Sequence, residues 1–137
     1  MKKVFALFLV VVLVCMSTCA IYAADLPDDT EIMPCYENIA LIYLGMTFDG
    51  THGDTVGTAS RMTGVTLMIG TLTLYEEQGD EWVYMDTATS RSTGQNIAVN
   101  IGFTGTPGVR YKVVFDLCAV KNRLYETETL EVIKTCK

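Results

Sequence analysis

The amino-acid sequence predicts an all-β protein, a seven-stranded antiparallel β-sandwich that follows an N-terminal signal peptide. Seven short segments are rich in Thr, Val, Ile, Leu and aromatic residues, and several of them alternate apolar with polar side chains. Clusters of Gly, Asp, Asn and Ser separate these segments. No long amphipathic helical pattern follows the leader, and an antiparallel β-barrel is the main alternative architecture.

The first 24 residues have the layout of a secretory signal peptide. Two lysines precede an apolar run, Val4 to Met16, which is shorter than the roughly 20 residues that a bilayer-spanning helix needs. The small residues Ala23 and Ala24 provide two cleavage positions. The residues before Cys15 and Cys19 match a lipoprotein motif poorly. We therefore expect a secreted or cell-envelope protein that is not inserted in the membrane after cleavage.

The mature chain is acidic. Removal of residues 1–24 removes two lysines, so eight basic residues face sixteen acidic ones and the formal charge is −8. Such a surface repels phosphate groups, which argues against nucleic acid and anionic membranes as partners. The 113 residues that remain of the 137 are enough for one domain. We expect an irregular arm over residues 25–35 and the β-sandwich over residues 36–137.

The first expected strand covers residues 39–48 and has one unbroken apolar face. Residues 49–57 predict a loop, because they contain three glycines and two aspartates. A weak strand is expected over residues 58–65. The clearest hairpin follows, between Thr66 and Thr89.

This central hairpin has strands over residues 66–75 and 82–86, joined by a polar turn over residues 76–81. A polar loop rich in Thr, Ser and Gly is expected after it, as far as Gln95. Residues 96–103 then alternate apolar with polar or small side chains, which predicts a strand with one solvated face.

The second clear hairpin ends the chain. It follows the turn sequence TGTPG at residues 104–108, and its own turn is expected near Lys121 and Asn122. Residues 123–133 predict an edge strand protected by glutamates. The preceding strand has an apolar face formed by Tyr111, Val113, Phe115 and Leu117.

Three cysteines remain after cleavage, and outside the cytoplasm a disulfide between two of them is expected. From the predicted final turn, Cys118 lies opposite Tyr125, roughly 36 Å from Cys136 along the strand. These two are therefore not expected to pair, and any disulfide involves Cys35. Cys136 is the preferred partner of Cys35, and Cys118 is the alternative.

The stretch from Gly108 to Val113 resembles the start of the sixth strand in fibronectin type III-like domains, where a Tyr packs inward and its hydroxyl caps nearby backbone. Over about residues 36–133 the chain is similar to a family of small secreted β-sandwich proteins of Gram-positive gut bacteria. That resemblance implies an immunoglobulin or fibronectin type III-like fold and an extracellular compartment, without an assigned activity. Its motifs are Gly57-Thr-Ala-Ser60, Leu72-Thr-Leu74, Gly79-Asp-Glu-Trp82 and Gly108-Val-Arg-Tyr111.

Few residues suggest metal binding or catalysis. Asp49, His52 and Asp54 could ligate a metal ion, but Asp and Gly in this segment equally suit a solvated turn, which is the favoured interpretation. The sequence has a single histidine and no Gly-x-Ser-x-Gly motif, so nothing pairs a nucleophile with a base. We expect neither enzymatic activity nor a cofactor.

Trp82 and Tyr84 are the candidate binding residues. They have the same parity on one strand and therefore share a face, which is either core or an exposed surface for an extracellular protein or carbohydrate. The expected function is that of a secreted, non-catalytic binding module. The alternative is a structural protein of the cell envelope, and a metal-binding protein or an enzyme is a more distant one.

Overall fold

The computed structural model describes residues 31–33 and 37–137, and these residues form an all-β fold, as predicted. The signal peptide expected over residues 1–24, most of the expected arm and Cys35 lie outside the described residues. No helix in the described ranges is long and apolar enough to cross a membrane. The strands are β1 (Glu31–Met33), β2 (Ile39–Asp49), β3 (His52–Arg61), β4 (Leu67–Gln78), β5 (Glu81–Ser92), β6 (Asn96–Thr104), β7 (Arg110–Lys121) and β8 (Leu124–Thr135).

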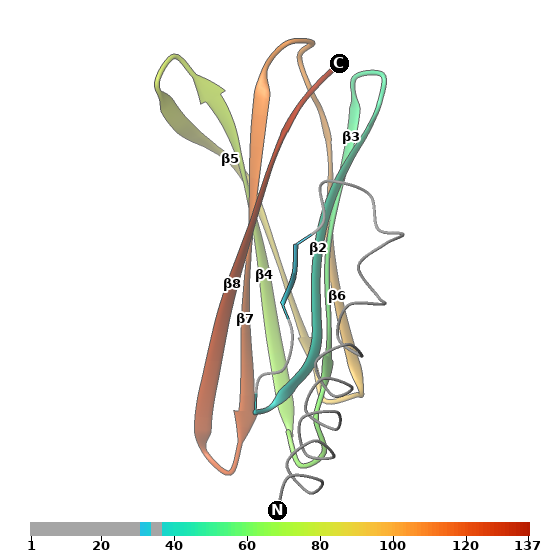
Figure 1. Cartoon of the computed structure of the whole chain (residues 1–137), viewed down its shortest axis with the longest axis vertical. Coiled ribbons are helices and arrows are strands. Elements are labelled where there is room, and N and C mark those ends of the chain that lie inside the picture. Colours follow the sequence, from blue (N-terminus) through green and yellow to red (C-terminus); the bar gives the residue numbers. More distant parts are fainter. Residues whose placement is uncertain (1–30, 34–36) are drawn as a thin grey trace, which may run out of the picture.

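The strands form two four-stranded antiparallel sheets, which lie as two layers in Figure 1. The first sheet has the order β1-β2-β3-β6 and the second has the order β5-β4-β7-β8. The seven longer strands match the predicted number. The three-residue β1 pairs with β2 in a segment that was expected to be irregular. In the second sheet, β4 pairs with β7, so the two predicted hairpins lie side by side.

The apolar core lies between the sheets, on the faces that the alternation predicted. On β6 every second residue from Ile97 to Ile101 is buried, and the residues between them are exposed. The apolar face of β7 is buried along its length. Burial of such rows is the main stabilising contribution to a two-layer β fold. The largest fully buried side chains are Tyr111, Phe115, Ile39, Ile42, Leu44, Met68, Leu72, Leu74, Leu117 and Leu130.

The predicted loop over residues 49–57 is wrong, because most of this segment belongs to β3. A Cβ atom on Gly53 would lie 2.4 Å from Cζ of Phe103, and one on Gly57 would lie 2.7 Å from Cδ2 of Phe115. Real Cβ atoms cannot approach so closely. The glycines therefore allow aromatic rings to pack directly on the strand backbone, and they do not form a turn.

Two further boundaries differ from the prediction. β3 ends at Arg61, short of residue 65, and Gly64 with φ of 92° lies in the turn that follows. β5 continues to Ser92, through most of the polar stretch that was expected to be a loop. There the hydroxyl of Thr89 lies 3.0 Å from that of Thr71 on β4. Polar β-branched residues suit the exposed face of a strand, which explains why this stretch is not a loop.

The final hairpin is confirmed, with its turn one residue later than predicted. Asn122 and Arg123 have φ of 52° and 65°, the left-handed values of a two-residue hairpin turn. Cys118 is therefore opposite Thr127 rather than Tyr125. β8 is an edge strand, as predicted.

Tyr111 anchors one end of the two layers. Its buried ring lies 5.0 Å from the ring of Phe103 and 5.8 Å from that of Phe48, centroid to centroid. Its hydroxyl accepts a hydrogen bond from the backbone N–H of Thr106 at 2.8 Å and donates one to Oε2 of Glu76 at 2.9 Å. The expected inward Tyr with a backbone cap is confirmed. Burial is the main cause that raises the pKa of the Tyr111 phenol.

Candidate functional site

Trp82 and Tyr84 point away from the core. The two-residue turn of the central hairpin places Trp82 opposite Glu77 and Tyr84 opposite Tyr75. On β4 the fully buried Leu74 precedes Tyr75, so Tyr75 and its partner lie on the opposite, outer face of the sheet. Of the two orientations that the sequence allowed, the structure has the outward one.

Five side chains form a cluster on this outer face, and we call it the hairpin cluster: Tyr75, Trp82, Tyr84, Arg110 and Lys112. Nζ of Lys112 lies 4.8 Å from the centroid of the Trp82 ring and 5.1 Å from that of Tyr75. Cζ of Arg110 lies 5.7 Å from the Trp82 ring, and the rings of Tyr75 and Tyr84 meet edge to face at 6.4 Å. An exposed cation–π contact contributes about 0.5–1 kcal/mol. The cations of β7 therefore hold the rings of β4 and β5 in place.

A carboxylate flanks the hairpin cluster. Arg110 donates two hydrogen bonds to Glu77, one from Nε to Oε2 at 2.7 Å and one from Nη2 to Oε1. These bonds are the main cause that lowers the pKa of Glu77, and they raise the pKa of Arg110. The guanidinium is thereby fixed in position over the Trp82 ring.

The edge of β5 beside the hairpin cluster is apolar and exposed. Val83, Tyr84 and Met85 are 38%, 56% and 38% exposed, although they are consecutive residues of one strand. β5 ends the sheet order, so this edge also presents backbone N–H and C=O groups. The segment from Trp82 to Met85 has no charged side chain in a protein whose formal charge is −6. It is thus suited to contact with another molecule.

The accessible part of the hairpin cluster is centred on Tyr84. Lys112 and Arg110 lie against the Trp82 ring and cover part of it. The exposed surface that a partner could contact therefore comes mainly from Tyr84 and the neighbouring Val83 and Met85. A tyrosine buries a large apolar area and keeps a hydroxyl for hydrogen bonding. Because the surrounding rings are already held, a partner would restrict few additional side chains on binding.

The residues proposed for a metal site lie on paired strands, and they come together only in part. Nε2 of His52 lies 3.3 Å from Oδ2 of Asp54, and Asp49 is the strand partner of His52. The side chains of His52 and Asp54 are 62% and 64% exposed. Within residues 31–33 and 37–137, no group of three or more His, Cys, Asp or Glu side chains could hold a metal ion.

Two cysteines are described, and both carry free thiols. Cys118 is half-buried on the outer face of β7, opposite Ile69. Cys136 is buried next to β8, with Sγ 3.7 Å from the carbonyl oxygen of Gly50. They are not joined to each other in the structure. The predicted pairings with Cys35 involve a residue outside the described ranges.

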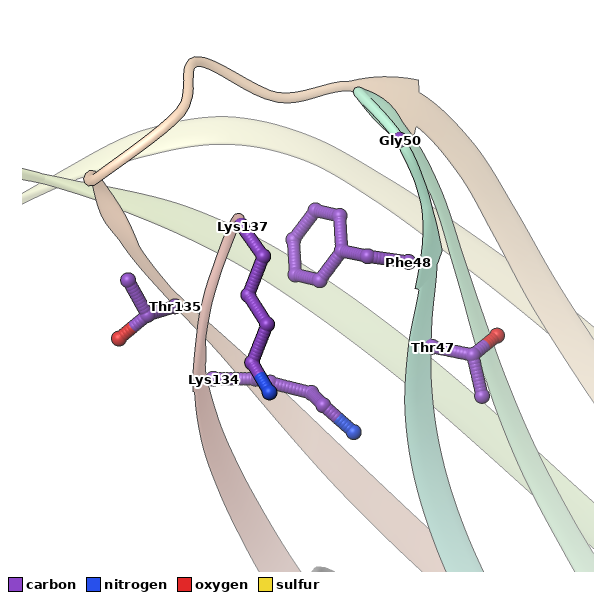
Figure 2. Close-up of a pocket in the computed structure, with 6 residues that line it drawn as sticks. All are labelled: Thr47, Phe48, Gly50, Lys134, Thr135 and Lys137. Carbon is purple, nitrogen blue, oxygen red and sulfur yellow. The ribbon is translucent and has the colours of Figure 1, made fainter.

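A hollow of about 380 Å³ opens where β2 and β8 end (Figure 2). The sequence did not single out its residues, because the two strands lie far apart along the chain and are not paired. It is lined by Thr47, Phe48, Gly50, Lys134, Thr135 and Lys137. A second hollow, of about 420 Å³, is lined by Leu41, Thr58, Ala59, Ser60, Asn96, Ile97 and Ala98 of the first sheet.

The sequence also missed the cations of the hairpin cluster. Arg110 and Lys112 alternate with the predicted apolar face of β7, and they lie on its other face. Their contact with Trp82 depends on the pairing of β4 with β7, which no local pattern reveals. The only available signal was that Lys112 and Trp82 each lie on the less apolar face of a predicted strand.

No known protein family matches this chain, and no curated protein matches it. The function is therefore inferred from the geometry of the hairpin cluster.

Proposed function

We propose that this protein is a secreted, non-catalytic binding module that recognises an extracellular protein through the hairpin cluster and the adjacent β5 edge. The observation that carries this proposal is the exposed, uncharged run from Val83 to Met85 beside rings that Lys112 and Arg110 hold in place. Tyr, Trp and Arg are the residues most enriched where protein interfaces concentrate their binding energy.

The proposed module is of the immunoglobulin or fibronectin type III-like kind, and the strand order supports this. Of the seven longer strands, the first, second and fifth lie in one sheet, and the third, sixth and seventh lie in the other. Immunoglobulin domains divide these strands in the same way, with the fourth strand in the first sheet; here the fourth, β5, lies at an edge of the second. The bond from the Thr106 N–H to the Tyr111 hydroxyl matches the tyrosine corner of such domains.

Secretion is supported by the basic and apolar pattern of residues 1–24. A non-catalytic role is supported by the position of the single histidine. His52 is 62% exposed on a strand, where water surrounds it, whereas acid–base catalysis needs a group held within reach of a bound substrate. A protein partner is favoured over a carbohydrate, because Lys112 and Arg110 lie against the Trp82 ring on which a sugar would stack.

The test compares the secreted protein with two single variants, Tyr84→Ala and Tyr125→Ala. Tyr125 is the matched control, since it is a tyrosine on the same sheet that is 73% exposed and lies outside the hairpin cluster. The three proteins are immobilised, and proteins retained from the extracellular fraction are quantified. Affinity for each purified candidate is then measured.

The expected result is a partner that binds the unmodified protein and Tyr125→Ala equally, and that binds Tyr84→Ala at least about tenfold more weakly. Partners that bind all three proteins alike would contradict the proposal. If the unmodified protein and Tyr125→Ala bind to an immobilised glycan array and Tyr84→Ala does not, the surface would instead be assigned to carbohydrate binding.

A further inference from the structure

The hollow between the ends of β2 and β8 is basic and has an apolar wall. Figure 2 shows the side chains of Lys134 and Lys137 entering the space between the two strands, and the ring of Phe48 projecting into the same space. Nζ of Lys134 also donates to the carbonyl oxygen of Met46 at 3.4 Å. Two ammonium groups beside one aromatic ring suit a ligand that combines carboxylates with an apolar group. In an acidic chain this is a local concentration of positive charge.

The course of β1 leads toward this hollow. β1 pairs antiparallel with β2, with Glu31 opposite Leu44. If this pairing continued beyond Glu31, each preceding residue would correspond to a position further along β2. Continuing the same register by two residues brings Asp29 beside Met46, whose carbonyl oxygen Lys134 contacts. The next positions along β2 are Thr47 and Phe48, which line the hollow.

The segment that precedes β1 has the matching chemistry. Residues 25–30 have the sequence DLPDDT, with three carboxylates, an apolar Leu-Pro pair and no basic residue. If residues 25–30 continue in the register of β1, Asp29 comes opposite Met46, next to Lys134, and Pro27 comes opposite Phe48 on the same face of the strand. Six residues span about 20 Å when extended, which covers the distance from β1 to the end of β2.

We propose that this hollow is a carboxylate-binding site and that its occupant is the acidic arm of the same chain, residues 25–30. Signal cleavage leaves this arm at the N-terminus of the mature protein. Because the arm is tethered through β1, its effective concentration at the hollow is high and modest contacts are enough to hold it. Seating the arm covers the edge of β2 beyond Leu44, where the pairing with β1 ends. This site is independent of the hairpin cluster.

The test measures how fast an endoprotease that cuts before aspartate cleaves the arm of the secreted protein. We expect cleavage at least about fivefold faster in the double variant Lys134→Gln/Lys137→Gln, because proteolysis follows the population of the released segment. About 0.5 M salt should accelerate cleavage of the unmodified protein in the same way, since salt screens the attraction. The charge-matched control, Lys121→Gln/Arg123→Gln, removes two cations from the β7–β8 turn and should be cleaved at the unmodified rate.

Equal cleavage of all three proteins would overturn the proposal. Protection that increases with protein concentration would place the arm on a second copy and overturn the same-chain assignment. A second measurement does not depend on the lysine variants. In a chain that lacks residues 25–30 and keeps β1, amide hydrogen exchange should accelerate at residues 47–50 and 134–137; unchanged exchange there would also overturn the proposal.

Discussion

Two groups of aromatic side chains lie on opposite faces of the second sheet, and adjacent residues of β7 contact each group. On the inner face, Tyr111 packs against Phe48 and Phe103 and both hydrogen bonds of its hydroxyl are made. On the outer face, the next residue, Lys112, lies against Trp82. The alternation of the strand assigns one residue to the core and its neighbour to the surface. The same types of ring therefore have different physical roles.

The inner rings are held by one another, and the central one, Tyr111, is fully buried. The outer rings are held by cations and remain open to solvent at Tyr84. We therefore expect inner substitutions to change stability, and outer ones to change binding with little change in stability.

The largest effect is expected for Tyr111→Ala. Removal of a fully buried aromatic ring should lower the free energy of unfolding by about 3–5 kcal/mol. Tyr84→Ala should change it by less than about 0.5 kcal/mol, because most of that ring is already in water. Urea denaturation of both variants measures the difference. Comparable losses in the two variants would show that the outer rings are also part of the core.

Tyr111→Phe isolates the hydroxyl. This variant keeps the ring but leaves the Thr106 N–H and the Glu76 carboxylate without their partner, so we expect a loss of about 1–2 kcal/mol. A loss below the error of urea denaturation would mean that water replaces the hydroxyl without cost.

The same variant also has a signature in alkaline solution. The pKa of Tyr111 is raised above its ordinary value of 10.0, mainly by burial. The unfolded chain therefore releases this proton at lower pH than the folded protein, and stability decreases as pH rises above about 10. Stability measured against pH should show this decrease in the unmodified protein and a smaller one in Tyr111→Phe.

An intermediate effect is expected for Lys112→Gln, which removes the cation from between two rings. The free energy of unfolding should decrease by about 1 kcal/mol, and Lys112→Arg should retain most of it, since Arg also stacks on aromatic faces. Trp82 is the only tryptophan, so acrylamide quenching of its fluorescence reports the cluster directly. Unchanged quenching in Lys112→Gln would show that the lysine does not cover the ring.

The smallest effect concerns Glu77, whose pKa is lowered mainly by its hydrogen bonds with Arg110. Its contribution to stability is present above the ordinary value of 4.5 and is lost as pH falls through the lower folded-state pKa. The difference in stability between the unmodified protein and Glu77→Gln should therefore shrink in acid. A difference that stays constant down to the acid limit of folding would contradict this pairing.

The strands that alternate most regularly were predicted well, and the glycine-rich and threonine-rich segments were not. β6, β7 and the hairpin of β4 and β5 follow a two-residue period that any strand with one buried face imposes. From the sequence alone, Gly53 and Gly57 predict a turn. In the structure they lie within a strand, because the rings of Phe103 and Phe115 pack directly on their backbone. Thr87 and Thr89 similarly predict a loop from the sequence, but in the structure they pair with residues of β4 and belong to a strand.

The candidate site was predicted in part for the same reason. Trp82 and Tyr84 share a face because they are two residues apart, which the sequence alone determines. Their outward orientation, and the cations that hold them, depend on which strand lies beside β4. The hollow between β2 and β8 depends on how the two sheets stack. The sequence of neither strand predicts that stacking.

By itself the sequence determined an all-β chain, the approximate positions of two hairpin turns and an inward Tyr111, because backbone alternation and turn chemistry act over a few residues. The tertiary structure decided that Lys112 lies against Trp82, that aromatic rings lie on Gly53 and Gly57, and that Lys134 reaches the Met46 carbonyl. These contacts join residues that are distant along the chain. Their formation depends on strand order and sheet stacking, which many local patterns allow and only the packed core selects.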